Sequence, residues 1–318
     1  MPPAPGSGPG SGPAQPVPAR PPGPANASGP GGVPRRRPHP EAALHTETWS
    51  PPRGGPGKSR LVLVHGFTQT GRSWAPLAER LAAAGHEALA VDTPGHGGSA
   101  RVLADLPAGA ELLGQAGGAA TYVGYSMGAR LALHLALAHP ELVRRLVVLG
   151  ATAGIDDPAE RAARRDSDEA LAKSLDPPAP SGAPGPGGGG SAGDEDGRQR
   201  LEQFLTAWTA QPLFATLPPE AAGLDDRRRN TPAGLAGSLR LAGTGTQAPL
   251  WDRLPGLSMP VLVVTGALDA RLTALARRLA TTIGANATLA VVGGAGHAAH
   301  LERPEAFLSA VLAFVGTE

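Results

Sequence analysis

The feature that most constrains the fold is an alternation, from about Arg60 onward, of short apolar runs with segments of helical pattern. Six runs are too short for helices and rich in valine, leucine and alanine, as expected of strands buried on both faces. These expected strands are residues 61–64, 88–91, 121–123, 146–149, 261–264 and 289–292. The expected helices between them are residues 73–84, 126–138, 272–282 and 304–314. The alternation predicts an α/β fold with a mostly parallel central sheet and flanking helices.

Residues 1–40 form a leader rich in proline and glycine, and about half of the 35 prolines precede residue 58. Because this segment has few large apolar side chains to bury, we predict that it is disordered. It lacks the apolar core of a secretory signal peptide, and no membrane-spanning run is expected elsewhere. Residues 41–318 are predicted to form a single domain.

Composition narrows the class of protein further. The absence of cysteine excludes disulfides, thiolate metal sites and a cysteine nucleophile, which fits a cytoplasmic protein. The formal net charge is +1, so we expect neither nucleic acid nor a membrane as partner. The arginines at residues 35–37 are interpreted as solvated charge. The sequence leaves open whether the protein is a monomer or a homo-oligomer.

A cap is predicted at about residues 153–245, between the fourth and fifth expected strands. Residues 158–175 and 201–241 have a helical pattern but fall outside the strand alternation. Residues 176–197, rich in glycine, proline and serine, are predicted to be a flexible insert. Ligands of open α/β sheets bind at the carboxyl ends of the strands, so residues of this cap are expected to face a substrate.

The motif GYSMG at residues 124–128 matches G-x-S-x-G, directly after an expected strand and before an expected helix. A turn this sharp leaves no room for a Cβ atom beside the serine and exposes its hydroxyl above the sheet. Ser126 is therefore a candidate catalytic residue. Asp269 follows the fifth expected strand and His297 the sixth, which is the chain order of a Ser-Asp-His triad on such a fold.

In such a triad, a neutral imidazole makes the serine reactive by accepting the proton of its hydroxyl. His297 would take the proton of Ser126, and Asp269 would orient the imidazole and stabilise its charged form. The backbone N–H groups of Phe67 and Met127 are expected to form an oxyanion hole.

Taken singly, these residues have simpler interpretations. Ser126 between glycines could be a turn, Asp269 a helix N-cap, and His297 a residue that fills a loop. Their joint position at strand ends predicts an intact catalytic site. No histidine pair has metal-ligand spacing with a carboxylate, and no G-x-G-x-x-G motif opens a helix after a strand, so neither a metal nor another cofactor is expected.

From about residue 61 to residue 314 these motifs resemble the α/β-hydrolase superfamily. A narrower resemblance depends on GYSMGAR, on the cap blocks at residues 160–175, 204–217 and 229–240, and on GALDARL and GAGHAAHLERPEAF. Together they are similar to the 2-succinyl-6-hydroxy-2,4-cyclohexadiene-1-carboxylate synthases of menaquinone biosynthesis. The cap block W-x-x-Q-P-L-F, which begins at Trp208, is far more specific than G-x-S-x-G.

The resemblance implies a carbon–oxygen lyase that eliminates pyruvate from 2-succinyl-5-enolpyruvyl-6-hydroxy-3-cyclohexene-1-carboxylate. In that reaction the triad abstracts a ring proton and no acyl-enzyme forms. The implied partner is a small molecule with three carboxylates, which suits several arginines in an enclosed pocket.

Candidate substrate-binding residues follow from the same resemblance. Arg130, four residues after Ser126, matches the arginine that ends the family's serine motif. The others are Tyr125, Arg164, Trp208 and Arg227, although Arg228 and Arg229 remain alternatives to Arg227. Ala129, where the family commonly has glycine, is a departure from which we expect little effect.

Two other functions compete with the lyase. A serine carboxylesterase would use Ser126 as a nucleophile and form an acyl-enzyme. A non-catalytic ligand-binding member of the fold would be expected to have a degenerate triad, whereas all three residues are present in this chain.

Overall fold

The computed structural model describes residue 1 and residues 43–52, 58–178 and 191–316. Backbone contacts divide the chain into two units, residues 1–36 and 37–318, and every element below belongs to the second. The leader that we predict to be disordered lies, apart from Met1, outside the described residues. Among the described residues, no helix has both the length and the apolar character needed to cross a membrane.

One seven-stranded sheet organises this unit, in the order β1-β3-β2-β4-β5-β6-β7. The strands are β1 (Thr46–Trp49), β2 (Arg60–Val64), β3 (Glu87–Val91), β4 (Ala120–Tyr125), β5 (Val143–Leu149), β6 (Val261–Gly266) and β7 (Ala287–Val292). β1 pairs antiparallel with β3, and every other pairing is parallel. The predicted mostly parallel α/β architecture is confirmed, and all six expected strands are present.

The edge strand β1 was not expected from the sequence. Its residues, Thr46 to Trp49, read TETW and are only partly buried. Since an edge strand pairs on one side only, it needs no continuous apolar run and gives no strong sequence signal.

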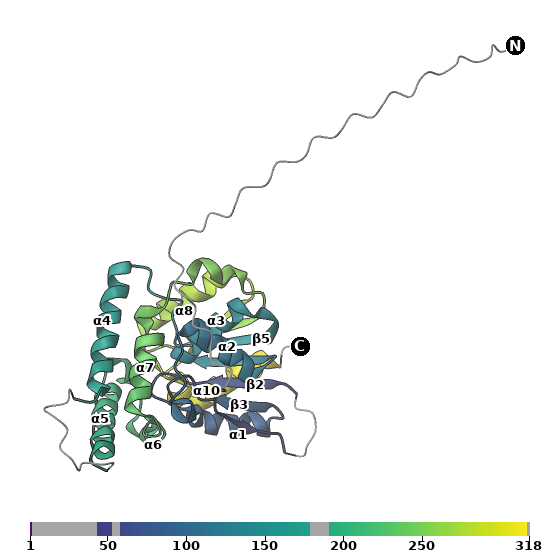
Figure 1. Ribbon diagram of the computed structural model, residues 1–318. Helices are drawn as coiled ribbons and strands as arrows, with labels where there is room; N and C mark the ends of the chain where they lie inside the picture. The colour runs from purple at the N-terminus through teal and green to yellow at the C-terminus, as the bar shows by residue number, and fades with distance from the viewer. Residues whose placement is uncertain (2–42, 53–57, 179–190, 317–318) are drawn as a thin grey trace. The chain divides into compact units, whose positions relative to one another are not determined.

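Helices cover both faces of the sheet (Figure 1). Those of the body are α1 (Ala75–Ala83), α2 (Leu106–Gly117), α3 (Met127–Ala138), α8 (Ala270–Ile283), α9 (Ala299–Glu302) and α10 (Pro304–Val315). Successive strand residues point to opposite faces, so Val62 packs in one apolar cluster with α2, α3 and α8. Leu61 and Leu63 pack in a second cluster, with α1 and α10.

Helix α2 was also missed, because its sequence LPAGAELLGQAG contains glycines that lower helix propensity. Packing explains them. A Cβ atom at Gly109 would lie 2.8 Å from the Leu131 side chain, and one at Gly114 would lie 2.9 Å from Leu135. Both neighbours belong to α3, so the glycines allow α2 to pack closely on the helix that follows Ser126.

The cap consists of α4 (Pro158–Leu175), α5 (Ser191–Thr209), α6 (Leu224–Arg227) and α7 (Pro232–Ala242). Figure 1 shows α4 and α7 side by side, as their contacts require. Apolar side chains of α4, α5 and α7 form a separate core, with Phe67 of the body packed against it. The expected helical stretch at residues 201–241 is interrupted by 3-10 turns at Pro212–Phe214 and Pro219–Ala221.

One boundary of the cap corrects the prediction of a flexible insert at residues 176–197. Helix α5 already begins at Ser191, so residues 191–197 are helical. Glu195 and Asp196 put negative charge close to the N-terminal end of α5, where it favours a helix. Residues 179–190 of the predicted insert lie outside the described residues.

Candidate active site

Ser126 occupies a strained turn between β4 and α3. Its φ angle is 51°, in the left-handed region that residues other than glycine seldom adopt. A Cβ atom at Gly124 would lie 2.5 Å from the Ala129 Cα, and one at Gly128 would lie 2.2 Å from the Val64 carbonyl oxygen. Both glycines of the motif are therefore required by space, as the motif predicts.

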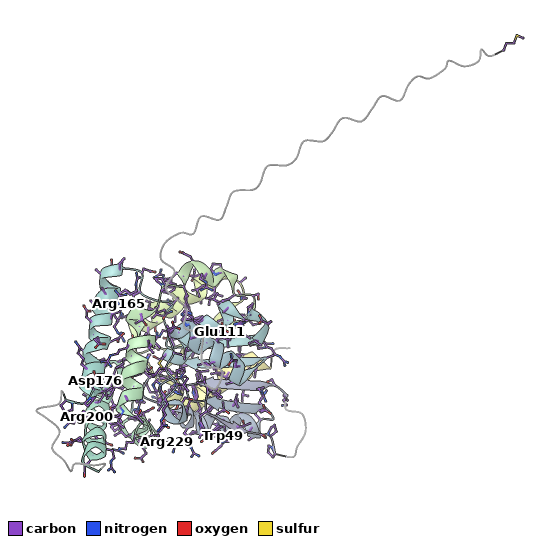
Figure 2. All side chains as sticks on the ribbon, viewed as in Figure 1. Trp49, Glu111, Arg165, Asp176, Arg200 and Arg229 are labelled. Atoms are coloured by element: carbon purple, nitrogen blue, oxygen red, sulfur yellow. The ribbon has the colours of Figure 1, made fainter. Side chains whose placement is uncertain are left out.

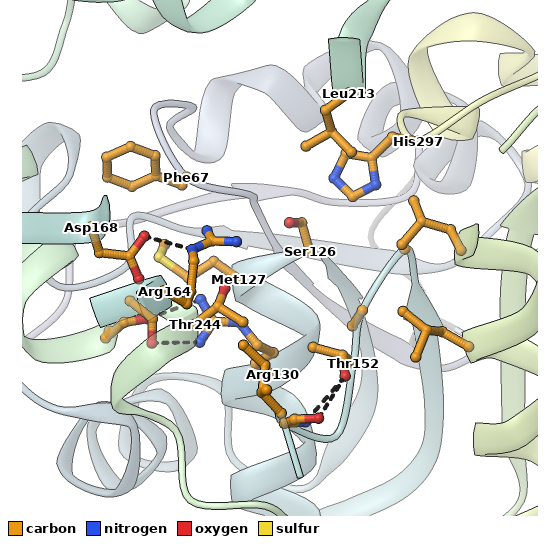
Figure 3. A pocket seen from close by; sticks show the side chains of 18 of the residues that line it. Phe67, Ser126, Met127, Arg130, Thr152, Arg164, Asp168, Leu213, Thr244 and His297 are labelled. Atoms are coloured by element: carbon orange, nitrogen blue, oxygen red, sulfur yellow. Dashed lines mark hydrogen bonds and ion pairs between the residues drawn. The ribbon is translucent and has the colours of Figure 1, made fainter. Parts of the chain in front are cut away.

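His297 lies in the loop after β7 and lines the same pocket as Ser126. Figure 3 shows its imidazole on the Ser126 side of that pocket. Burial lowers the pKa of His297 to about 4, and the nearby Asp269 opposes this only in part. The ring is thus neutral near pH 7 and able to accept a proton. Within the described chain, no hydrogen bond joins it to Ser126, and its Nδ1 has no partner.

Asp269 is a helix N-cap, which was the simpler of its two interpretations from the sequence. Its Oδ1 accepts a hydrogen bond from the Leu272 N–H at 2.9 Å, so it caps the N-terminus of α8. It does not line the pocket, and it acts on the base through its charge, which raises the pKa of His297. Asp269 therefore interacts with His297 through its charge but forms no hydrogen bond with it.

Phe67 and Met127, the expected oxyanion-hole residues, both line the pocket. Neither backbone N–H donates a hydrogen bond to another residue that the structure describes. Two buried histidines fix the loop that carries Phe67: the Thr93 N–H donates to His65 Nε2 at 3.0 Å, and the Thr68 N–H to His96 Nε2 at 3.3 Å. The backbone N–H groups of Phe67 and Met127 thus remain available to a ligand.

The pocket has a volume of about 620 Å³ and lies between the sheet and the cap. All the predicted site residues except Asp269 line it: Phe67, Tyr125, Ser126, Met127, Arg130, Arg164, Trp208, Arg227 and His297. Trp208 packs edge to face on Phe67 at 4.9 Å between ring centroids, and Tyr125 packs on His297 at 5.1 Å. Aromatic side chains from body and cap thus line the same pocket as Ser126.

Arg130 is buried and bonds to the C-terminus of the cap helix α7. Its Nη2 donates to the Ala242 carbonyl oxygen at 2.9 Å and its Nη1 to that of Gly243 at 3.3 Å. Burial lowers the pKa of Arg130 to about 10, and the charge of Arg164 acts in the same direction. The negative charge of Asp168 acts in the opposite direction. Arg130 stays charged at neutral pH, and no ion pair joins it to an acid among the described residues.

The structure distinguishes the three adjacent cap arginines. Arg227 is buried and lines the pocket, where it donates to the Ala222 carbonyl oxygen at 2.7 Å and to the Thr68 hydroxyl. Arg228 is exposed and pairs with Glu202. Arg229 is also exposed, near the lower edge of the view in Figure 2. Only Arg227 of the three reaches the pocket.

Two carboxylates of the site were missed by sequence reasoning. Asp168, one turn after Arg164 on α4, is buried and accepts a hydrogen bond from Arg164 Nε at 2.8 Å (Figure 3). Glu302 is buried and accepts from the N–H groups on either side of His297, those of Gly296 at 2.7 Å and Ala298 at 3.0 Å. Glu302 thereby holds the loop that carries His297. The one available signal was its position five residues after His297.

Histidine burial predicts a pH-dependent stability. Burial lowers the pKa values of His65, His96, His134, His297 and His300, to about 3 for His96 and His300 and about 4 for His134 and His297. Below about pH 6.5 these histidines are protonated in the unfolded chain but remain neutral in the folded protein. The free energy of unfolding should therefore decrease as the pH is lowered. The decrease is at most about 1.4 kcal/mol per ring and pH unit, and it ends at the pKa of the ring in the folded protein.

Urea unfolding at pH 7 and pH 5 tests this expectation, because carboxylates titrate mostly below that window. An unfolding free energy that is equal at the two pH values, or higher at pH 5, would contradict it.

A serine at a strained strand-to-helix turn, above a mostly parallel sheet and beside a histidine after the last strand, defines an α/β-hydrolase fold. The model of the alpha/beta hydrolase family matches residues 61–310, and the chain belongs to this family. Among the described residues, no cluster of three or more histidine, aspartate or glutamate residues could hold a metal ion.

The narrower resemblance is confirmed by two curated relatives named 2-succinyl-6-hydroxy-2,4-cyclohexadiene-1-carboxylate synthase. That of Klebsiella pneumoniae is 32% identical over 267 residues, which cover 80% of this chain and 93% of the relative. That of Serratia proteamaculans is 30% identical over 264 residues, covering 80% and 92%.

Among solved structures, MenH from S. aureus superposes with a TM-score of 0.71 at 26% identity, covering 86% of this chain and 98% of that one. A thermophilic esterase from Thermogutta terrifontis gives a TM-score of 0.62 at 24% identity, covering 86% and 93%, and this likeness concerns the fold alone.

Proposed function

We propose that this protein is a carbon–oxygen lyase of menaquinone biosynthesis. It would eliminate pyruvate from 2-succinyl-5-enolpyruvyl-6-hydroxy-3-cyclohexene-1-carboxylate and leave 2-succinyl-6-hydroxy-2,4-cyclohexadiene-1-carboxylate. The names of the curated relatives support this reaction. The positively charged side chains that line the pocket also support it.

The observation that carries the proposal is a pair of buried arginines beside Ser126. Arg130 and Arg227 line the pocket and are 6% and 1% exposed. Both donate to backbone carbonyls, and no carboxylate of the described residues pairs with either. The negative charges of Asp168 and Asp226 raise the pKa values of Arg130 and Arg227, but neither carboxylate forms an ion pair with these arginines. A buried charge without a direct partner is costly. A substrate carboxylate would supply that partner, whereas a neutral ester would not.

The chemistry starts with removal of a proton from the substrate ring. His297 accepts the Ser126 hydroxyl proton, and the serine oxygen takes the ring proton beside the succinyl carbonyl. Negative charge then develops on that carbonyl oxygen, where the N–H groups of Phe67 and Met127 stabilise it. As the electrons return to the ring, a new C=C bond forms and the C–O bond to the enolpyruvyl group breaks. The leaving enolate gains a proton and becomes pyruvate.

A serine carboxylesterase is the alternative, since its fold and nucleophile would be the same. The deciding experiment measures pyruvate release from the enolpyruvyl substrate beside hydrolysis of an aryl ester and labelling by a fluorophosphonate. We expect steady pyruvate release and, at most, slow ester turnover. Rapid ester hydrolysis without pyruvate release would refute the lyase and support the esterase.

A further inference from the structure

Five arginines line the pocket in the part of the chain that the structure describes: Arg130, Arg164, Arg227, Arg271 and Arg278. Two of them are already paired with acids of the protein. Arg164 bonds to Asp168 at 2.8 Å. Arg278 bonds to Asp156 at 2.7 Å and also stacks on the Trp251 ring at 3.7 Å. These two charges are compensated before any substrate binds.

The remaining three, Arg130, Arg227 and Arg271, pair with no carboxylate of the described residues. Arg130 and Arg227 are buried and bonded to the protein, whereas Arg271 is exposed and makes neither a hydrogen bond nor an ion pair there. Two further acids line the pocket, at the start of α4. Asp157 caps that helix, and Glu160 is exposed and makes no ion pair with Arg271 among the described residues.

Arg271 lies at the N-terminal end of α8, as the second residue of this 14-residue helix. Asp269 is the acidic side chain at this end. It caps the helix by accepting a hydrogen bond from the Leu272 N–H, and among the described residues it makes no ion pair with Arg271. The N-terminal end of a helix also favours a bound anion, so a carboxylate at this end of the pocket would pair with the guanidinium.

Resting on the proposed function, we propose that Arg271 is a further substrate-binding residue, which takes the third carboxylate at the exposed side of the pocket. The number of arginines without an acidic partner then equals the number of carboxylates on the substrate. Arg130 and Arg227 would hold two of these groups in the buried part. Arg271 would act on binding rather than on the proton transfer, because among the described residues no hydrogen bond or ion pair joins it to His297, Phe67 or Met127.

Steady-state pyruvate release by the full chain tests the proposal, with Arg271→Ala compared with Arg277→Ala. Arg277 is exposed on the same helix but does not line the pocket, so it is a matched control for charge and helix propensity. We expect Arg271→Ala to raise KM roughly 5- to 20-fold with kcat changed less than about twofold. Arg277→Ala should leave both constants unchanged.

Two further measurements separate binding from structure. Arg271→Lys should recover part of the KM, because the charge remains while the forked geometry is lost. The KM difference between wild type and Arg271→Ala should shrink as salt is raised, because the proposed contact is exposed and therefore screened. An active wild type with equal KM in the two alanine variants overturns the proposal alone. A wild type that releases no pyruvate overturns the proposed function and this inference with it.

Discussion

Ser126→Ala should abolish most of the pyruvate release while the protein remains folded. Ser126 is the only serine of the described chain that lines the pocket beside His297 at a strained turn. A positioned proton-transfer group contributes about 10²- to 10⁴-fold to a rate, and we expect kcat to fall by this amount. KM should change little, since the arginines proposed to hold the substrate carboxylates are untouched. Pyruvate release by the purified variant measures the effect.

Ser174→Ala is the matched control for Ser126→Ala. Ser174 is an exposed serine of α4 that does not line the active-site pocket, so its removal should leave kcat unchanged. Thermal unfolding of both variants would exclude misfolding as the cause of lost activity. A folded Ser126→Ala protein that keeps more than about a tenth of the wild-type kcat would remove Ser126 from the chemistry.

Arg130→Ala should weaken both catalysis and the cap. Loss of a charge-assisted bond to a substrate carboxylate costs on the order of 1.5 to 3 kcal/mol, or roughly 10- to 150-fold in kcat/KM. The carbonyl groups of Ala242 and Gly243 also lose their donor, so the free energy of unfolding should fall by about 1 to 3 kcal/mol. Kinetics at a temperature at which the variant is folded, and urea unfolding, measure the two effects.

Arg130→Lys and Arg229→Ala separate the contributions. The lysine keeps the positive charge but cannot reach a carboxylate and two carbonyls with one planar fork, so partial recovery is expected. Arg229 is exposed and outside the pocket, so its removal should alter neither property. If Arg130→Ala lost stability but kept its kcat/KM, Arg130 would be a tie to the cap and not a substrate-binding residue.

Much of the body was predictable because its signals are local. The expected strands are runs such as LVLV at residues 61–64, in which consecutive apolar side chains indicate a strand buried on both faces. The turn at Ser126 was predictable because two glycines must flank it. In contrast, α2 was hidden by glycines whose reason is the approach of α3, which no local pattern reveals.

The candidate site was predictable in its membership but not in its contacts. The motifs named nine residues that line the pocket, yet Asp269 bonds to its own helix and leaves Nδ1 of His297 without a partner in the described structure. Glu302 holds the loop of the base through two backbone groups, a contact with no sequence motif. Whether a carboxylate caps a helix or orients an imidazole depends on side-chain geometry and not on chain order.

By itself, the sequence determined the α/β architecture, the position of Ser126 at the turn and the chain order of the three proposed catalytic residues. Hydrophobic periodicity and turn chemistry act between residues that are near in the chain. Only the tertiary structure decided which arginines are buried without acidic partners. Arg130 bonds to residues more than 110 positions away and Arg227 to one 159 positions away. The charge offered to a substrate depends on such distant neighbours, because burial and pairing exist only once the cap has folded over the sheet.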